Sequence, residues 1–116
     1  MINQLFGLKG KTALITGGSS GLGEGIALAL GLAGAEIAIA ARREPQLAEA
    51  VGRLSKQGIK TSSFVADLSV LEQSNELSTQ VLSKLGKVDI LVNAAGINLR
   101  EPFEAISPQS WQDQLN

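Results

Sequence analysis

A glycine-rich stretch, Thr-Gly-Gly-Ser-Ser-Gly-Leu-Gly at residues 16–23, has the residue types and spacing to hold a phosphate. An apolar run at residues 13–15 precedes it, and apolar residues at helical spacing follow it, namely Leu22, Ile26, Ala29, Leu30 and Ala33. A turn between a strand and a helix points backbone N–H groups outward at the positive end of the helix. Its glycines allow a sharp turn, a close approach to a pyrophosphate and close packing of the helix. The stretch predicts a dinucleotide-binding site, although its spacing is not the usual G-x-G-x-x-G.

Two arginines, Arg42 and Arg43, follow a second apolar run at residues 37–41. At this place in a dinucleotide-binding fold an acidic residue binds the ribose diol of NAD, whereas arginine accepts the 2′-phosphate of NADP. Ser19 could add a hydroxyl to that phosphate. Glu44 is a rival, because it stands near the spacing of about 20 residues typical of the acidic residue. An acid is also expected there as the start of a helix, and the arginines could be only a solvated pair.

Polar residues also follow the third and fourth apolar runs. Asp67 and Leu68 come after the third, where a carboxylate could accept the exocyclic amine of adenine. Asp67 could equally serve only to start a turn. Asn93 to Gly96 come after the fourth, and small residues there let the backbone lie close to a ribose or nicotinamide. Asn93 could instead be a turn residue that satisfies backbone groups.

The elements that position these residues alternate between strand and helix along the chain. Glycines mark the ends of the helices, Pro45 the first turn of the second helix, and Ser69 with Glu72 a capping box that opens the third. The pattern predicts a Rossmann-type α/β fold, a doubly wound parallel sheet with strand order 3-2-1-4. The expected strands are residues 12–16, 37–41, 61–66 and 88–92, and the expected helices are residues 22–33, from 45 to before Gly58, from 69 to before Gly86, and from 107 onward with Trp111 and Leu115.

The composition excludes several classes of protein. Without cysteine or histidine the chain has no disulfide, no thiol nucleophile, no Ser-His-Asp triad and no His-based zinc site, and we assign no metal. A net charge of −1 gives no reason to expect nucleic acid as a partner. No apolar run has the ~20 residues of a membrane span, and the N-terminus lacks the features of a signal peptide, so we expect a cytoplasmic protein. The last predicted helix has no stop signal, which predicts that residues 1–116 are the N-terminal part of a single, longer domain.

The four motifs together resemble the cofactor half of the short-chain dehydrogenase/reductase family, and the likeness covers essentially the whole chain. It implies an oxidoreductase that transfers hydride between NAD(P) and a carbonyl or secondary alcohol. NADP(H) is the preferred cofactor because of Arg42, and NAD(H) is possible. Ala94 departs from the family, which more often has a second asparagine there. The implied cofactor-binding residues are Gly17, Ser19, Ser20, Gly21, Leu22 and Gly23 in the turn, Arg42 and Arg43, Asp67 and Leu68, and Asn93, Ala94 and Gly96.

The catalytic residues that the resemblance implies are absent from the sequence. The family uses a helix asparagine, a serine and a Tyr-x-x-x-Lys pair, whereas this chain has no tyrosine. Asn116 stands short of the position that the family's spacing from Trp111 predicts. We therefore assign no catalytic residue and expect the 116-residue chain alone to be inactive.

For the complete protein the resemblance leaves several functions open. The expected partner is a small carbonyl or alcohol substrate, either a sugar acid such as gluconate or a 3-oxoacyl carrier-protein thioester, and the expected assembly is a homo-oligomer, a tetramer. The alternatives are a non-catalytic dinucleotide-binding module and a structural Rossmann-like protein that binds no cofactor.

Overall fold

The fold is a four-stranded parallel sheet between helices, with strand order β3-β2-β1-β4. The computed structural model describes residues 7–19 and 21–94. Within them the elements are β1 (Thr12–Thr16), α2 (Gly21–Leu32), β2 (Glu36–Ala41), α3 (Glu44–Lys56), β3 (Thr61–Val65), α4 (Leu71–Leu85) and β4 (Ile90–Asn93). The predicted fold class and strand order are therefore confirmed. The helix predicted from residue 107 onward lies outside the described residues.

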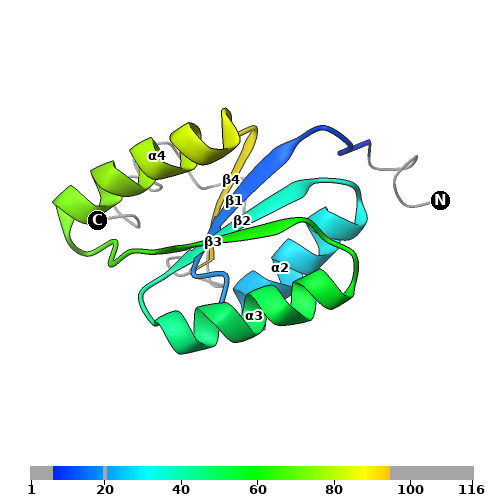
Figure 1. Ribbon diagram of the computed structural model, residues 1–116, viewed down its shortest axis with the longest axis horizontal. Coiled ribbons are helices and arrows are strands. Elements are labelled where there is room, and N and C mark those ends of the chain that lie inside the picture. Colours follow the sequence, from blue (N-terminus) through cyan, green and yellow to red (C-terminus); the bar gives the residue numbers. More distant parts are fainter. Residues whose placement is uncertain (1–6, 20, 95–116) are drawn as a thin grey trace, which may run out of the picture.

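The helices cover both faces of the sheet, α2 and α3 on one side and α4 on the other (Figure 1). Successive residues of a strand point to opposite faces, so the apolar runs without polar alternation supply both cores. One core joins Ile15, Ile37 and Ile39 to Leu47 and Leu54 of α3. The second joins β-strand residues to α4 and contains Leu14, Ala38, Ala40, Phe64, Leu77 and Val81. Burial of each large aliphatic side chain stabilises the fold by about 1.5–3 kcal/mol.

A glycine with positive φ follows each described helix within two residues, as expected from the sequence. Gly86 is the C-cap of α4 in the left-handed conformation, with φ of 83°, and its N–H donates to the carbonyl of Leu82. Glycine adopts this conformation without the steric cost that a Cβ atom imposes. Gly34 after α2 and Gly58 after α3 also have positive φ, of 113° and 80°.

The start of α4 differs from the predicted capping box. The helix begins at Leu71, and its N-cap residue, Val70, makes no side-chain capping hydrogen bond. Ser69 instead donates its backbone N–H and its hydroxyl to the Asp67 carboxylate, at 3.0 and 2.6 Å. The prediction was wrong because the preceding aspartate takes the donors of Ser69, which leaves that residue in the turn before the helix.

The buried face of α2 is narrower than predicted. Leu22, expected on that face, is 44% exposed, and Ala29 is also exposed. The fully buried positions are Gly23 and Ala27, one turn apart. Small residues on this line let the helix lie close to the sheet, so the larger apolar side chains pack at its margins.

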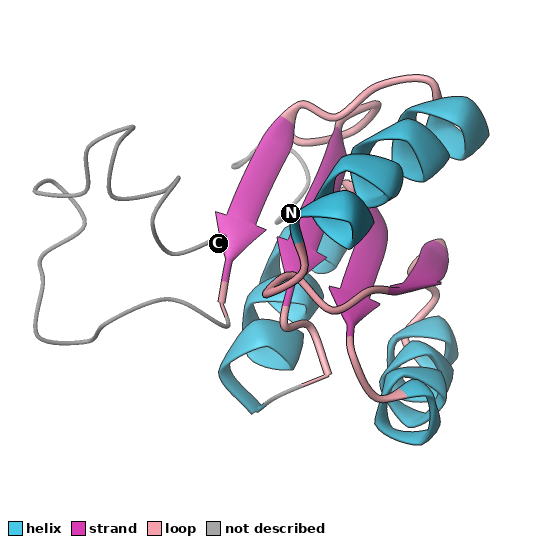
Figure 2. Ribbon diagram, turned by 90° about the vertical axis from the view of Figure 1, so that its left-hand side faces the viewer, coloured by secondary structure: helices cyan, strands magenta, loops and turns pink. Residues whose placement is uncertain are grey.

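Among the described residues, β4 is one of the two edge strands of the sheet, and β3 is the other. Leu91 is in register with Leu14, so both point to the face that carries α4. Leu91 is nevertheless 44% exposed. Figure 2 shows β4 at the edge of the group of strands.

Candidate cofactor-binding site

The carboxyl ends of the four parallel strands lie side by side at one end of the sheet, called here the carboxyl edge. In the register of the sheet Thr16 of β1 is beside Ala40 of β2 and beside Asn93 of β4. Backbone hydrogen bonds continue past the strand ends, from Gly17 N to Ala40 O at 2.7 Å and from Ala94 N to Thr16 O at 2.9 Å. The residues that follow the strands therefore lie along the carboxyl edge, where parallel α/β sheets bind their ligands.

The glycine turn at this edge is sterically restricted to glycine at several positions. Gly17 has φ of 76°, in the left-handed region where a side chain is strained. A Cβ atom on Gly18 would lie 2.6 Å from a methyl group of Ile39, so the turn lies directly on β2. A Cβ atom on Gly23 would collide with the carbonyl group of Gly17. The turn and the start of α2 thus approach each other as closely as two backbones can.

The outer side of the same turn is open. A Cβ atom on Gly21 would meet nothing within 4 Å, and both Gly21 and Leu22 are exposed. Ser19 is half-buried, while Ser20 lies outside the described residues. The arrangement leaves the N-terminal turn of α2 accessible, and this end of a helix carries partial positive charge.

A buried hydrogen bond joins the start of the turn to the end of β4. The hydroxyl of Thr16 donates to Oδ1 of Asn93 at 2.9 Å, and both residues are 1% exposed. Asn93 is the last residue of a strand, which contradicts its interpretation as a turn residue. Ala94 is buried behind it, and Gly96 lies outside the described residues.

Asp67 follows β3 and organises the turn that leads to α4. Its hydrogen bonds from Ser69, first from the hydroxyl and then from the backbone N–H, lower the pKa of the carboxyl group, and the charge of Arg42 adds to this. Its own backbone N–H donates to Oε1 of Gln73 at 2.7 Å. Asp67 therefore takes part in the turn, and this observation does not decide between a turn residue alone and one that also binds adenine. Its contact with adenine, and that of the half-buried Leu68, stay predictions.

The arginine pair lies between β2 and α3. Arg42 directly follows the strand, and Arg43 is the N-cap residue of the helix, with φ of −105° and ψ of 110°. Both are exposed, and Arg42 acts electrostatically on Asp67 at the end of the neighbouring strand. Glu44, the acidic rival, is the first residue of α3, where a negative charge complements the helix dipole.

An ion pair beside the glycine turn was not predicted from the sequence. Arg53 of α3 donates from Nε and one Nη nitrogen to the two carboxylate oxygens of Glu24, both at 2.7 Å. Glu24 lies in the first turn of α2, next to Gly23. The partners are distant in sequence, so no local spacing pattern could have indicated this pair.

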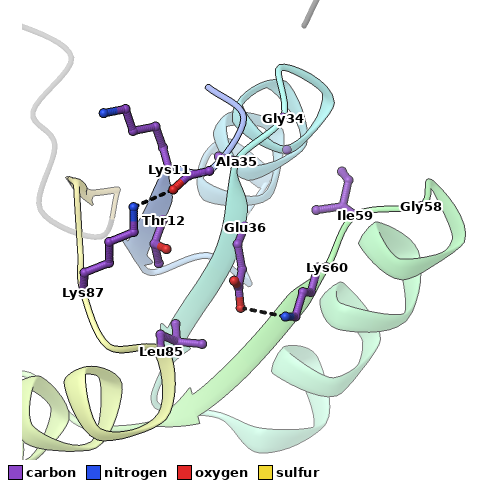
Figure 3. Close-up of a pocket in the computed structure, with 12 residues that line it drawn as sticks. Lys11, Thr12, Gly34, Ala35, Glu36, Gly58, Ile59, Lys60, Leu85 and Lys87 are labelled. Carbon is purple, nitrogen blue, oxygen red and sulfur yellow. Dashed lines mark hydrogen bonds and ion pairs between the residues drawn. The ribbon is translucent and has the colours of Figure 1, made fainter. Parts of the chain in front are cut away.

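A pocket of about 440 Å³ lies away from this edge, at the amino ends of the strands. Figure 3 shows Lys11, Lys60 and Lys87 around it, with Lys60 paired to Glu36. Lys87 donates to the carbonyl of Gly10 at 2.5 Å and pairs with Asp89 at 3.0 Å. Because these two lysines already have partners and the C-terminal ends of the helices gather here, we assign no ligand to this pocket.

The sequence of residues 11–116 matches the short chain dehydrogenase family. The chain therefore belongs to this family of oxidoreductases, which have a Rossmann-type fold and use NAD(P) nucleotides. The predicted family membership is confirmed. Among the described residues, no helix has the length and hydropathy needed to cross a membrane.

Individual relatives agree with this assignment. The chain is 40% identical over 116 residues to the 2-dehydro-3-deoxy-D-gluconate 5-dehydrogenase of Dickeya dadantii (strain 3937), covering 100% of this chain and 45% of the relative. The structure of 2-keto-3-deoxy-D-gluconate dehydrogenase from Streptococcus agalactiae matches with a TM-score of 0.72 and 36% identity, over 91% of this chain and 40% of that one. A short-chain type dehydrogenase/reductase from Mycobacterium marinum matches with a TM-score of 0.76 and 34% identity, over 97% and 46% of the two chains. The chain thus spans less than half the length of these relatives.

Proposed function

We propose that this chain is the cofactor-binding part of an oxidoreductase that transfers hydride between NADP(H) and a carbonyl or secondary alcohol. The observation that carries the proposal is that residues far apart in the sequence lie together at the carboxyl edge of the sheet. Gly17, Arg42 and Asp67 each follow a strand, and the register of the sheet brings these strand ends together. Family membership supports the use of a nicotinamide dinucleotide.

The residues at the edge fit the parts of such a dinucleotide. The accessible N-terminal turn of α2, with Gly21 and Leu22 on its open side, suits a pyrophosphate. Asp67 and Leu68 would face the adenine, and Asn93 and Ala94 the ribose of the nicotinamide half. In this assignment Ser20 and Gly96 complete the two contact regions. When bound, the nicotinamide ring supplies or accepts the hydride, while the protein residues orient it.

The preference for NADP(H) is attributed to Arg42 and Arg43. Both are exposed at the end of β2, and a charge-assisted hydrogen bond to a 2′-phosphate contributes about 1.5–3 kcal/mol. In the intact protein, Arg42→Asp should raise the dissociation constant for NADPH by a factor at least about ten times larger than the factor for NADH. Dissociation constants for both cofactors, measured by calorimetry, test this.

A matched control for this experiment is Lys56→Asp, the same charge reversal on an exposed residue at the far end of α3. It should change the affinities for both cofactors little and equally. Equal losses for NADPH and NADH in Arg42→Asp would contradict the role of the arginine and support the solvated-pair interpretation. Absence of binding of either cofactor to the wild-type protein would contradict the proposed function itself.

For the substrate we propose a sugar acid related to gluconate. The relatives from Dickeya dadantii and Streptococcus agalactiae are named for deoxygluconates with a keto group, which favours this class over a 3-oxoacyl carrier-protein thioester. The test is the rate of NADPH oxidation or NAD(P)⁺ reduction by the intact protein with each of the two substrates. Faster turnover of the thioester would reverse the assignment.

We also propose that residues 1–116 are the N-terminal part of a single longer domain, which assembles as a homo-oligomer, a tetramer in our expectation. The chain alone should not catalyse the reaction. Reduction of a carbonyl needs a proton donor, whose assistance is typically worth about 10²–10⁴-fold, and the chain contains neither tyrosine nor histidine. Aspartates are ionised acceptors at neutral pH and cannot replace it. Turnover proportional to the concentration of the purified chain would contradict this prediction.

A further inference from the structure

The ion pair between Glu24 and Arg53 joins α2 to α3 in a bidentate geometry, with the Arg53 side chain 53% exposed. Both carboxylate oxygens of Glu24 accept from the guanidinium group at 2.7 Å, and the Glu24 side chain is only 21% exposed. The hydrogen bond from Arg53 is the main cause that lowers the pKa of Glu24. Arg53 also lies 3.9 Å from Glu49, one turn earlier on its own helix, but this contact is longer and Glu49 is 70% exposed. The guanidinium is thus committed mainly to Glu24.

The position of Glu24 makes this commitment relevant to cofactor binding. Glu24 lies in the first turn of α2, directly after Gly23, and α2 is the helix whose N-terminal end is assigned to the pyrophosphate. A carboxylate there is attracted by the same partial positive charge that attracts a phosphate. An uncompensated Glu24 would therefore oppose the binding of a pyrophosphate by like-charge repulsion.

We propose that Arg53 is a positioning residue for the dinucleotide, which neutralises Glu24 and turns its carboxylate toward α3. In this arrangement the first turn of α2 keeps its attraction for an anion although it carries an acidic residue. The inference rests on the proposed function, because it concerns the same pyrophosphate. It assigns to Arg53 an effect on affinity without any contact with the cofactor.

A purely mechanical role for the pair leads to different expectations. If the pair only fastens α2 to α3, removal of either partner should disturb the turn, and removal of both should be no better than removal of one. If Arg53 acts by neutralising Glu24, the two substitutions have opposite signs. Loss of the arginine should weaken binding, whereas loss of the carboxylate charge should not, and it should restore binding when the arginine is missing.

The experiment is a double-mutant cycle on the intact protein, with the dissociation constant for NADPH as the readout. Arg53→Ala should raise the dissociation constant about fivefold, Glu24→Gln should leave it unchanged or lower it, and the double variant should return to within about twofold of wild type. Lys56→Ala removes the same charge one turn further along α3 and should have no effect. Glu49→Gln, which removes the weaker carboxylate partner, should also have none.

Salt provides a second readout that a mechanical fastening would not change. At about 1 M salt the Debye length is about 3 Å, so the ratio between the dissociation constants of Arg53→Ala and wild type should fall below about twofold. A Glu24→Gln variant that binds several-fold more weakly than wild type would overturn the inference, even if Arg53→Ala did not fold. So would an Arg53→Ala variant with wild-type affinity. A wild-type protein that binds no dinucleotide would instead contradict the proposed function.

Discussion

The charged residues at the two ends of the sheet differ in their partners. At the amino ends of the strands these residues bind one another, as when Asp89 accepts from the backbone N–H of Thr12 at 2.8 Å and pairs with Lys87. At the carboxyl ends glycines keep the backbone accessible, and Arg42 and Arg43 are exposed. The helix dipoles favour the lysines at the amino ends, where the negative helix ends gather. They do not account for Arg42 and Arg43, which lie at the carboxyl ends beside positive helix ends.

This difference teaches that binding and stability are largely separated along the strands. Substitutions in the glycine turn and at Arg42 should lower affinity for the dinucleotide, whereas substitutions at the amino ends should change the free energy of unfolding and leave affinity intact. Thr16 is an exception, because its buried bond to Asn93 contributes to stability at the carboxyl end. Glu24 and Arg53 belong to the carboxyl-end group by position, although they form an ion pair of the kind found at the other end.

The strongest test of the separation is a methyl group added at the glycine turn. In Gly23→Ala the new Cβ atom would collide with the carbonyl group of Gly17, so α2 must move away from the turn. We expect the dissociation constant for NADPH to rise by about 100-fold or more in the intact protein, equivalent to about 2.7 kcal/mol. Calorimetric titration measures this.

Gly25→Ala is the matched control, two residues further along the same helix. Its Cβ atom would meet nothing within 4 Å, so affinity should be unchanged and the helix should gain about 0.5–1 kcal/mol. Similar affinities for the two variants would show that the close approach of turn and helix is not required for binding.

A smaller effect is expected from the buried bond at the carboxyl end. Thr16→Val removes the hydroxyl that donates to Asn93 and leaves the shape nearly unchanged, which should lower the free energy of unfolding by about 1–3 kcal/mol. Thr12→Val makes the same change at the opposite end of β1 and keeps the backbone hydrogen bond to Asp89. It should therefore lower the free energy of unfolding by less than Thr16→Val does. Urea denaturation compares the two. An equal loss of unfolding free energy in the two variants would show that the Thr16–Asn93 hydrogen bond does not add to stability beyond the loss of a hydroxyl.

The smallest expected effect is the pH dependence of stability at the amino ends. Backbone donation from Thr12, followed by donation from Lys87, lowers the pKa of Asp89 below its ordinary value of 3.8. The folded pKa is the lower one, so this contribution is present above pH 3.8 and is lost as the pH falls through the folded value. Asp89→Asn should therefore reduce the difference between urea midpoints at acid and neutral pH, with unchanged affinity for NADPH. The same difference between the two urea midpoints in Asp89→Asn and wild type would contradict this prediction.

Local patterns allowed most of the fold to be predicted from the sequence. The range of β1 was predicted residue for residue, and the positive φ angles of Gly34, Gly58 and Gly86 fall at the predicted helix ends. The strand order followed from the doubly wound topology typical of dinucleotide-binding sheets, whose crossovers are right-handed. The glycine turn was recognised for the same reason, since its residues are contiguous.

Contacts between distant residues could not be predicted in the same way. The pairing of Glu24 with Arg53 depends on how α2 lies against α3, and that of Thr12 with Asp89 on the register between β1 and β4. The capping box failed for a related reason, because Asp67 competes for the donors of Ser69 and spacing alone does not rank the two acceptors. Side-chain competition is decided by geometry rather than by residue type.

The right-handed crossover rule fixes the face of the sheet that would carry the connection from β4 to a further parallel strand. Right-handed crossovers from β1 to β2 and from β2 to β3 put α2 and α3 on one face, and the return from β3 to β4 puts α4 on the other. A further parallel strand beyond β4 continues the direction of that return, so its crossover falls on the α4 face again. It would cross the face to which Leu91, 44% exposed, points. The exposed side chain of Leu91 is thus an apolar surface that such a crossover would bury.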